Sequence, residues 1–201
     1  MAEFSIIDTY FNRQTVTSND GNAVDLGVGD DSALLTPPPN QPLVICADTL
    51  VAGRHFPLDT SPHAIGWKSV AVNLSDIAAM GAKPQSILLA LSLPQIDHDW
   101  LKGFSQGLYD CCDQFGVSLI GGDTTQSPHL TISVTALGWV DIGQAVTRSA
   151  AQVGDLICVS GTVGDAAFAL QHLGHPLQRR LDYPTPRCEL GQALKGLAHS
   201  M

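Results

Sequence analysis

The sequence is poor in basic residues and in glutamate. Only 10 of its 201 residues are Lys or Arg, against 19 acidic residues, and the formal net charge is −9. Nonspecific nucleic-acid binding depends on clustered Lys and Arg, so we expect no nucleic-acid partner. All acidic residues except Glu3 and Glu189 are Asp, a side chain that favours caps, turns and metal coordination over helix interiors.

Long apolar segments are also missing. No apolar run approaches the roughly 20 residues that span a bilayer. Residues 1–4 show neither the basic stretch nor the apolar stretch of a secretory signal. We therefore expect a cytoplasmic protein without a membrane partner. The apolar content of 44% is sufficient for a buried core.

The common motifs of nucleotide-binding and hydrolytic enzymes are absent. The chain has no Walker P-loop, no dinucleotide-binding Gly-x-Gly-x-x-Gly in the right context and no Gly-x-Ser-x-Gly elbow. Its five cysteines form no Cys-x-x-Cys pair and are odd in number, so neither a disulfide framework nor a zinc site is expected. The cysteines are interpreted as small buried hydrophobic residues.

Apolar segments and capping signals predict an α+β fold. Ser61-Pro62 and Asp97 have the residue types that begin helices, and Gly81 and Gly116 those that end them. The expected order is β-α-β-α-β-β, a mixed sheet with helices packed on one face. The expected strands are 43–48, 86–93, 117–120 and 130–140, and the expected helices are 61–80 and 97–115.

A second unit begins after the apolar strand at 130–140. The predicted division gives residues 1–147 to an N-terminal domain, which the polar motifs discussed below would make the ATP- and Mg²⁺-binding part of the chain. Residues 148–201 would be the start of an incomplete C-terminal α+β domain, with a strand at 156–160 and helices at 166–173 and 184–199. One strand and two helices are too few to close a core of their own.

Four aspartate motifs lie beside glycines or at the ends of apolar runs. They are Gly-Val-Gly-Asp-Asp at 27–31, Ala-Asp-Thr at 47–49, Asn-Leu-Ser-Asp at 73–76 and Gly-Gly-Asp-Thr-Thr at 121–125. Carboxylates suit Mg²⁺, which is held by a few of them together with water and substrate phosphates. The set predicts a Mg²⁺ cluster that holds a polyphosphate, with Arg148 as a phosphate clamp. The alternative is that these Asp are ordinary caps and turns and that Arg148 is solvated.

Asp76 is expected on a largely buried helix. Asn73 and Asp76 share one face of that helix, and their neighbours Val70, Leu74 and Ile77 are apolar. A buried carboxylate needs a partner or a metal. The structural alternative is a pair with Lys68 or a cap on a neighbouring element.

The motifs together resemble the thiamine-monophosphate kinases, within the aminoimidazole ribonucleotide synthetase superfamily. The resemblance covers the chain in order and includes the segments 27–35, 47–56, 71–84, 119–125, 147–149 and 160–165. Leu-Val-Ala-Gly-Arg-His-Phe at 50–56 is the stretch that favours the kinases over their siblings.

The resemblance implies phosphorylation of thiamine monophosphate by ATP to give thiamine diphosphate, in a homodimer formed through the N-terminal domain. It implies Mg²⁺ ligands, ATP contacts from Gly121, Gly122 and Arg148, and a substrate contact from His55. Tyr109 is a candidate for stacking on adenine. No side chain is implied as a general base, because the acceptor phosphate is already ionised. The implied Mg²⁺ ligands are Asp30, Asp31, Asp48, Asp76 and Asp123.

Two departures from the family pattern affect this interpretation. Many relatives carry hydroxyl residues where this chain has Cys46 and Ala47, which removes a possible oxygen ligand. The family's later Asp-x-Ser-Asp-Gly motif does not occur, so we expect a truncated chain with weak activity at best. The alternatives are a sibling ATP-dependent synthetase or maturation protein, and a nucleotide-binding dimerisation fragment without turnover.

Overall fold

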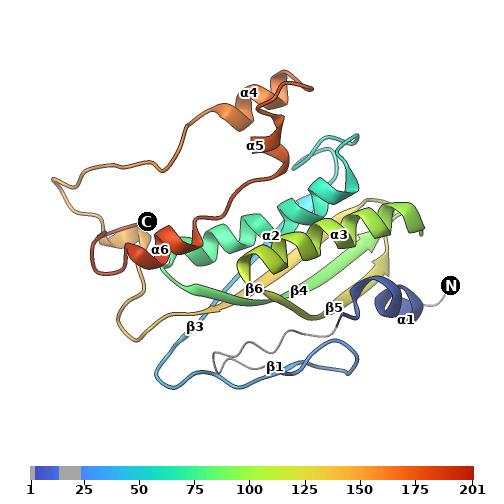
Figure 1. Cartoon of the computed structure of the whole chain (residues 1–201), viewed down its shortest axis with the longest axis horizontal. Helices are drawn as coiled ribbons and strands as arrows, with labels where there is room; N and C mark the ends of the chain where they lie inside the picture. The colour runs from blue at the N-terminus through green and yellow to red at the C-terminus, as the bar shows by residue number, and fades with distance from the viewer. Residues whose placement is uncertain (1–2, 14–23) are drawn as a thin grey trace.

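A four-stranded mixed sheet is the centre of the computed structural model, which describes residues 3–13 and 24–201 (Figure 1). The strand order is β3-β6-β4-β5. β6 is antiparallel to both of its neighbours, whereas β4 and β5 are parallel. β3 and β5 therefore form the two edges. The strands are β3 (Leu43–Val51), β4 (Lys83–Leu93), β5 (Ser118–Gln126) and β6 (Thr131–Trp139).

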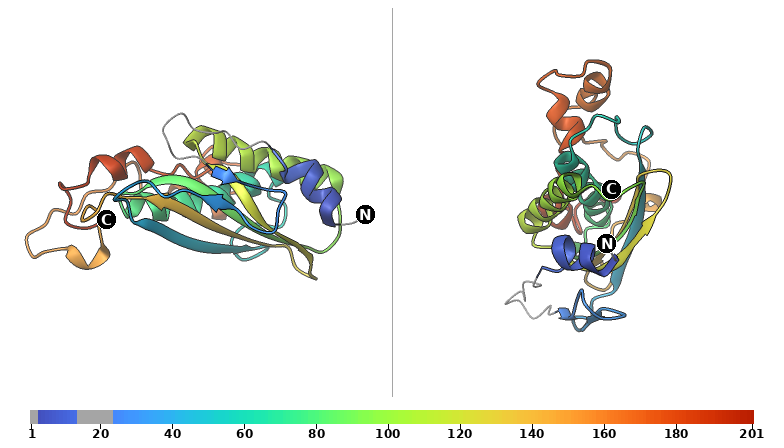
Figure 2. Two further views of the ribbon diagram at one scale, coloured as in Figure 1. Left: turned by 90° about the horizontal axis from the view of Figure 1, so that it is seen from below. Right: turned by 90° about the vertical axis from the view of Figure 1, so that its right-hand side faces the viewer.

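Two long helices, α2 (Pro62–Ala79) and α3 (His98–Phe115), cover one face of the sheet, as predicted (Figure 2). The Ser61 hydroxyl accepts a hydrogen bond from the Ala64 N–H, and the Asp97 carboxylate accepts one from the Trp100 N–H. Gly116 ends α3 with a φ of 65°, a conformation that glycine adopts at little cost. The predicted α+β class and both helix starts are confirmed.

β5 extends six residues beyond its predicted end at 120. Its glycine, aspartate and threonine residues disfavour a strand by propensity. Parallel pairing with β4 continues as far as Leu93 opposite Gln126, so tertiary pairing overrides the local preference. Asp123 consequently lies within an edge strand and not in a loop.

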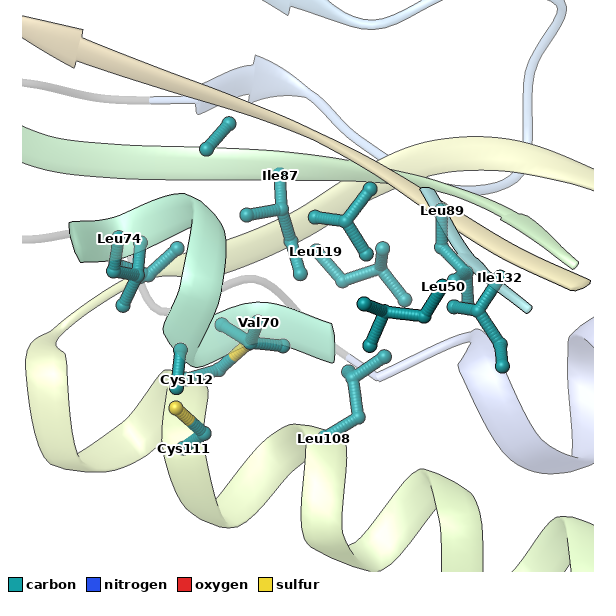
Figure 3. Packing of buried hydrophobic residues seen from close by; sticks show 14 of the residues in the cluster. Leu50, Val70, Leu74, Ile87, Leu89, Leu108, Cys111, Cys112, Leu119 and Ile132 are labelled. Atoms are coloured by element: carbon teal, nitrogen blue, oxygen red, sulfur yellow. The ribbon is translucent and has the colours of Figure 1, made fainter. Parts of the chain in front are cut away.

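The core lies between the sheet and the helices (Figure 3). Ile87 and Leu119 from the sheet meet Val70 and Leu74 from α2 and Leu108 from α3. Each of these residues is at most 4% exposed, and such burial contributes roughly 1.5–3 kcal/mol for a large apolar side chain.

Cys111, Cys112 and Cys188 are buried as expected and Cys46 is partly buried, whereas Cys158 is exposed, so the expectation of a buried side chain is wrong there. Burial raises the pKa of the Cys111 thiol, and it raises that of Cys112 to about 12. These thiols stay protonated at neutral pH. Cys111 and Cys112 therefore behave as small apolar side chains of the core.

The helices α2 and α3 approach each other at two glycines. A Cβ atom at Gly66 would lie 2.1 Å from the carbonyl oxygen of Phe104, and one at Gly107 would lie 1.9 Å from that of His63. Both helices need glycine at this crossing because a methyl group would overlap the opposite backbone.

The N-terminal segment was not predicted as regular structure. It comprises α1 (Glu3–Ile6) and the π-helix η1 (Ile7–Phe11), and a small antiparallel pair follows, β1 (Val24–Leu26) with β2 (Leu34–Leu35). The Tyr109 hydroxyl donates to the Phe11 carbonyl at 2.8 Å, and Arg13 pairs with Asp113 at 2.8 Å. The segment is thus held against α3.

The C-terminal part contains short helices only: η2 (Arg148–Ala150), α4 (Asp165–Gln171), α5 (Gln178–Asp182) and α6 (Cys188–Ala193). The predicted strand at 156–160 is wrong. Leu156 and Ile157 are 90% and 97% exposed, and the described residues provide no neighbouring strand to pair with their backbone groups. The predicted helix at 184–199 shortens to α6.

Several contacts hold the C-terminal part against α2, including a hydrogen bond to Trp67 and a close approach of two helices. Trp67 Nε1 donates to the Pro184 carbonyl at 2.9 Å. Helix α6 lies so close that a Cβ at Gly191 would be 2.2 Å from the Ala78 carbonyl oxygen. The division of the chain at 147/148 remains a prediction.

Gly107→Ala is expected to destabilise the protein despite the better helix propensity of alanine, which is worth about 1 kcal/mol. Overpacking at so short a distance from the His63 carbonyl costs about 3 kcal/mol, the upper end of the usual range, so a net loss of about 2 kcal/mol should lower the melting temperature by roughly 4–8 °C. Gly103→Ala, also in α3, is the matched control, because the nearest atom to its Cβ would be Pro62 Cβ at 3.1 Å and the nearest backbone atom would be the His63 nitrogen at 3.8 Å. Circular dichroism during thermal unfolding measures both variants. Equal stability of the two would contradict the close-contact interpretation.

Candidate functional site

One group of predicted site residues lies at the β3 edge, where Asn73 connects strand and helix. The Asp48 N–H donates to Asn73 Oδ1 at 2.9 Å, and Asn73 Nδ2 donates to the Ser69 carbonyl at 2.9 Å. Asn73 is fully buried, so these hydrogen bonds offset the cost of removing its amide from water. Its role is to fix β3 against α2, which places Asp48 beside Asp76.

Asp76 is exposed, so the expectation of a buried carboxylate is wrong. Much of its helix is buried, but Ser75 and Asp76 lie on the exposed side of α2, away from the core. Partial desolvation, and after it the charge of Asp48, raises the pKa of Asp76, while Arg148 lowers it. Two carboxylates that repel each other beside an arginine form a place where a cation and an anionic ligand can both bind.

The alternative pair of Asp76 with Lys68 is not formed. Lys68 Nζ instead donates to the His55 carbonyl at 2.9 Å. Burial lowers the pKa of Lys68, and the charge of Asp182 opposes this shift. Lys68 therefore stabilises the turn that contains His55.

Cys46 lies beside the same group. Its Sγ is 3.3 Å from the Asn73 carbonyl oxygen. Burial, followed by the charges of Asp76 and Asp48, raises the pKa of its thiol to about 11. At neutral pH the thiol is uncharged and adds no oxygen ligand. This agrees with the loss of a possible oxygen ligand where many relatives carry a hydroxyl residue.

A second group of predicted residues surrounds a cavity of about 440 Å³ at the β5 edge. Its polar rim contains Asp30, Asp31 and Asp123 with the backbone of Gly121 and Gly122. Its apolar wall includes Ile7 and Phe11 of η1 and Leu89 and Leu119 of the sheet. The sequence analysis missed the contribution of η1. The four-residue spacing of Ile7 and Phe11, together with Tyr10, is the sequence pattern that could have indicated this helix.

Gly122 has a structural reason to be glycine. Its φ is +149°, and a Cβ would lie 1.8 Å from the Leu89 carbonyl oxygen. At Gly121 a Cβ would meet only the flexible Leu88 Cδ2, at 3.2 Å. The close approach of β5 to β4 therefore requires glycine at 122 whether or not a phosphate binds there.

The two groups are separated by the width of the sheet. Three strand spacings of about 4.8 Å place the β3 and β5 backbones roughly 14 Å apart, too far for Asp48 and Asp123 to share one Mg²⁺ with bonds of about 2.1 Å. In the described part of the chain, no three His, Cys, Asp or Glu side chains come close enough to hold a metal ion. Each edge of a single chain therefore offers a partial metal site.

His55 lies in the turn that follows β3, apart from both carboxylate groups in sequence. Its Nδ1 accepts a hydrogen bond from the Val51 N–H at 3.0 Å. A neutral ring that accepts at Nδ1 carries its proton on Nε2. His55 can therefore donate a hydrogen bond from Nε2 to an anionic ligand.

Comparison with known proteins identifies the family. Residues 29–140 match the model of AIR synthase related protein, N-terminal domain. The chain belongs to the AIR synthase related family. Thiamine-monophosphate kinase from Haemophilus influenzae is 46% identical over 99% of this chain, and the chain spans 62% of that relative. The resemblance to these kinases predicted from the motifs is confirmed.

Solved structures of the same family support the fold. Thiamine-monophosphate kinase from Stenotrophomonas maltophilia superposes with a TM-score of 0.87 at 48% identity, over 100% of this chain and 66% of that one. A structure described as AaThiL complexed with AMPPCP and TMP superposes with a TM-score of 0.75 at 26% identity, over 98% of this chain and 62% of that one. Among the described residues, no helix has the length and apolar character of a membrane span.

Asp76→Asn is expected to stabilise the metal-free protein slightly at pH 7, raising the melting temperature by no more than about 2 °C. A carboxyl whose folded pKa is raised destabilises the fold when ionised, so the gain should vanish as the pH falls below the ordinary carboxyl pKa, about 4. Thermal unfolding in EDTA at both pH values tests this, with the exposed Asp59→Asn as control. A loss of stability at pH 7 that persists at acid pH would contradict it.

Proposed function

We propose that this chain is the ATP- and Mg²⁺-binding part of an enzyme that phosphorylates thiamine monophosphate to thiamine diphosphate. Its similarity to thiamine-monophosphate kinases supports the substrates. The observation that carries the chemistry is the group of Asp48, Asp76 and Arg148, in which paired carboxylates adjoin a phosphate-binding side chain. This group offers metal and anion sites together.

The residues at both edges fit Mg²⁺. Each edge would supply part of the coordination shell, from Asp48 and Asp76 at the β3 edge and from members of the group Asp30, Asp31 and Asp123 at the β5 edge. All these ligands are carboxylate oxygens, which suit a hard cation. Bound Mg²⁺ would neutralise the phosphates of two anionic substrates that otherwise repel each other and an acidic protein.

The cavity at the β5 edge suits the base of the nucleotide. Its apolar wall offers a flat ring a contact surface, and Gly121 and Gly122 lie where phosphates would leave the cavity. Tyr109 is not free to stack as predicted, because its hydroxyl bonds the Phe11 carbonyl and Arg13 lies over its ring, 5.1 Å from the centroid. We assign Tyr109 to holding the apolar wall in place.

Phosphoryl transfer would proceed directly between the substrates. An oxygen of the acceptor phosphate forms a bond to the terminal phosphorus of ATP while the bond from that phosphorus to ADP breaks. The acceptor is ionised at neutral pH, so no side chain needs to remove a proton. The protein contributes positioning and neutralisation of charge, with Arg148 on ATP and the His55 Nε2–H on the acceptor.

A homodimer would unite the two partial sites. The sheet face away from the helices carries Leu43 and Ile45, which are 41% and 59% exposed, an unusual exposure for strand residues of this kind. If two sheets pack on this face about a two-fold axis parallel to the strands, β3 of one chain lies over β5 of the other. The β3 edge with Asp48 and Asp76 would then lie beside the β5 edge with Asp123 of the second copy.

The alternative of a nucleotide-binding dimerisation unit without turnover stands beside the kinase as the second candidate function. The chain spans 62% of the length of the kinase from Haemophilus influenzae. The sibling synthetase alternative has less support, because the relatives compared above are thiamine-monophosphate kinases. Turnover and substrate dependence separate the three possibilities.

Thiamine monophosphate should stimulate the release of ADP from ATP by this chain, and EDTA should abolish that release because both carboxylate groups depend on Mg²⁺. A coupled ADP assay with thiamine, selenide and no acceptor as controls makes the measurement. Metal-dependent binding of AMPPCP without ADP release would favour the binding unit. Stimulation by a different acceptor would reject the kinase.

Mixing Asp48→Asn with Asp123→Asn should restore nucleotide binding that each variant lacks by itself. If each site takes one carboxylate group from each chain, a mixed dimer keeps one intact site of two. An equimolar mixture should then recover about a quarter of the wild-type sites, since half of the dimers are mixed. Titration with AMPPCP and Mn²⁺ counts the sites.

The control is a mixture of Asp48→Asn with Asp76→Asn, whose altered residues belong to the same edge. This pair should restore no sites, because both changes fall on the half-site that one chain contributes. Recovery in both mixtures, or in neither, would show that the site is not divided between chains.

A further inference from the structure

The loop that carries Arg148 leaves the body of the protein next to the carboxylate pair of the β3 edge. Val146 is 5% exposed, and its N–H donates to the Met80 carbonyl at 3.2 Å. Met80 caps the C-terminal end of α2, about one helical turn after Asp76. Arg148 follows Val146 closely in the chain, and its charge acts on the Asp76 carboxyl. The start of the loop therefore places the arginine beside the carboxylate.

The rest of this loop is shaped by its own residues but lies in solvent. Residues 147–155 are all exposed, and the hydrogen bonds between them are local. The Ala150 N–H donates to the Thr147 carbonyl at 3.4 Å, and the Gln152 N–H donates to the Asp155 carboxylate at 2.8 Å. Bonds of this kind close turns without fixing a loop against the sheet. The position of the loop therefore depends on contacts from outside it.

Two residues much later in the chain supply such contacts. His199 Nδ1 is 2.7 Å from Asp155 Oδ1, and the Ser200 hydroxyl donates to the Arg148 carbonyl at 3.2 Å. The Gln152 N–H, and after it His199, lower the pKa of Asp155, so this carboxyl is ionised at neutral pH and can only accept. Nδ1 of His199 therefore carries a proton and donates it to the hydrogen bond. The loop is held near both of its ends.

The segment that carries these two residues is itself attached to α2. Helix α6 lies at the C-terminal end of α2 (Figure 1), where a Cβ at Gly191 would be 2.2 Å from the Ala78 carbonyl oxygen. Cys188, at the start of α6, is 5% exposed and belongs to the core. The Ala198 N–H donates to the Leu194 carbonyl at 2.9 Å, so helical hydrogen bonding continues up to the supporting residues. The loop is thus supported from the same helix that carries the carboxylate.

We propose that His199 and Ser200 are positioning residues that hold the guanidinium of Arg148 ready for the phosphates of a Mg²⁺-bound nucleotide. This inference rests on the proposed function, since it concerns the phosphate clamp of that same site. Both residues act through the loop and not on the ligand. Without them the loop would have to become ordered when the nucleotide binds, and the entropy lost in ordering it would weaken the affinity.

Calorimetric titration with AMPPCP in saturating Mg²⁺ tests the proposal by a double-mutant cycle. Replacing His199 and Ser200 together by alanine should weaken AMPPCP binding roughly 3- to 10-fold, the range for exposed hydrogen bonds of this kind. Arg148→Gln should weaken it at least as much, because a displaced side chain cannot lose more than an absent one. In the Arg148→Gln background the two alanines should have no further effect. A merely structural role would weaken binding in both backgrounds.

A conservative variant and a matched control sharpen the test. His199→Asn should keep most of the affinity that His199→Ala loses, because the asparagine Nδ2 lies near the position of the imidazole Nδ1 and can donate to Asp155. His175→Ala is the control. His175 is also exposed in the C-terminal part, and its ring accepts a local hydrogen bond from the Leu177 N–H at 3.2 Å, so its removal should leave AMPPCP binding unchanged.

The outcomes separate this inference from the proposed function. If Arg148→Gln weakens AMPPCP binding and the two alanines do not, the positioning role is wrong while the proposed function stands. If Arg148→Gln has no effect, the phosphate clamp and its support fail together. If the wild-type chain does not bind AMPPCP in Mg²⁺, the proposed nucleotide site fails as well.

Discussion

The buried amide of Asn73 links the sheet to the helix layer at the point where the chemistry is expected. Its oxygen accepts from the backbone of Asp48 in β3, and its nitrogen donates within α2. A polar side chain without partners would be costly in this interior, so the position of α2 along β3 is specified by more than apolar packing. The distance between Asp48 and Asp76, and with it the raised pKa of Asp76, depends on that register.

Under the proposed function, the two edges of the sheet would have different roles. The β3 edge combines carboxylates, Arg148 and the turn with His55, which suits transferred phosphates and an anionic acceptor. The β5 edge combines carboxylates with an apolar cavity, which suits a nucleotide base. A sheet whose helices occupy one face leaves the other face free to bring these edges together in a dimer.

The core of the fold follows closely from the sequence, because caps and apolar periodicity are local signals. Ser61, Asp97 and Gly116 mark helix ends that the structure confirms. The strand expected at 156–160 failed because an apolar segment becomes a strand only with a partner, which no local pattern guarantees. Likewise the sequence indicated which aspartates could bind metal, but their separation into two groups depends on strand order, a property of the whole sheet. The exposure of Asp76 was missed because one residue can point outward from a buried helix.

The glycine at 122 has a consequence for how related sequences should be compared. Any side chain there would collide with the backbone of Leu89, so every chain that keeps this strand pairing must keep the glycine, whatever ligand it binds. Invariance at this position in an alignment would then record the geometry of two neighbouring strands and carry no information about ATP. At position 121 a methyl group would meet only the movable side chain of Leu88. Restricted sequence variation at that position would therefore indicate that a ligand binds there.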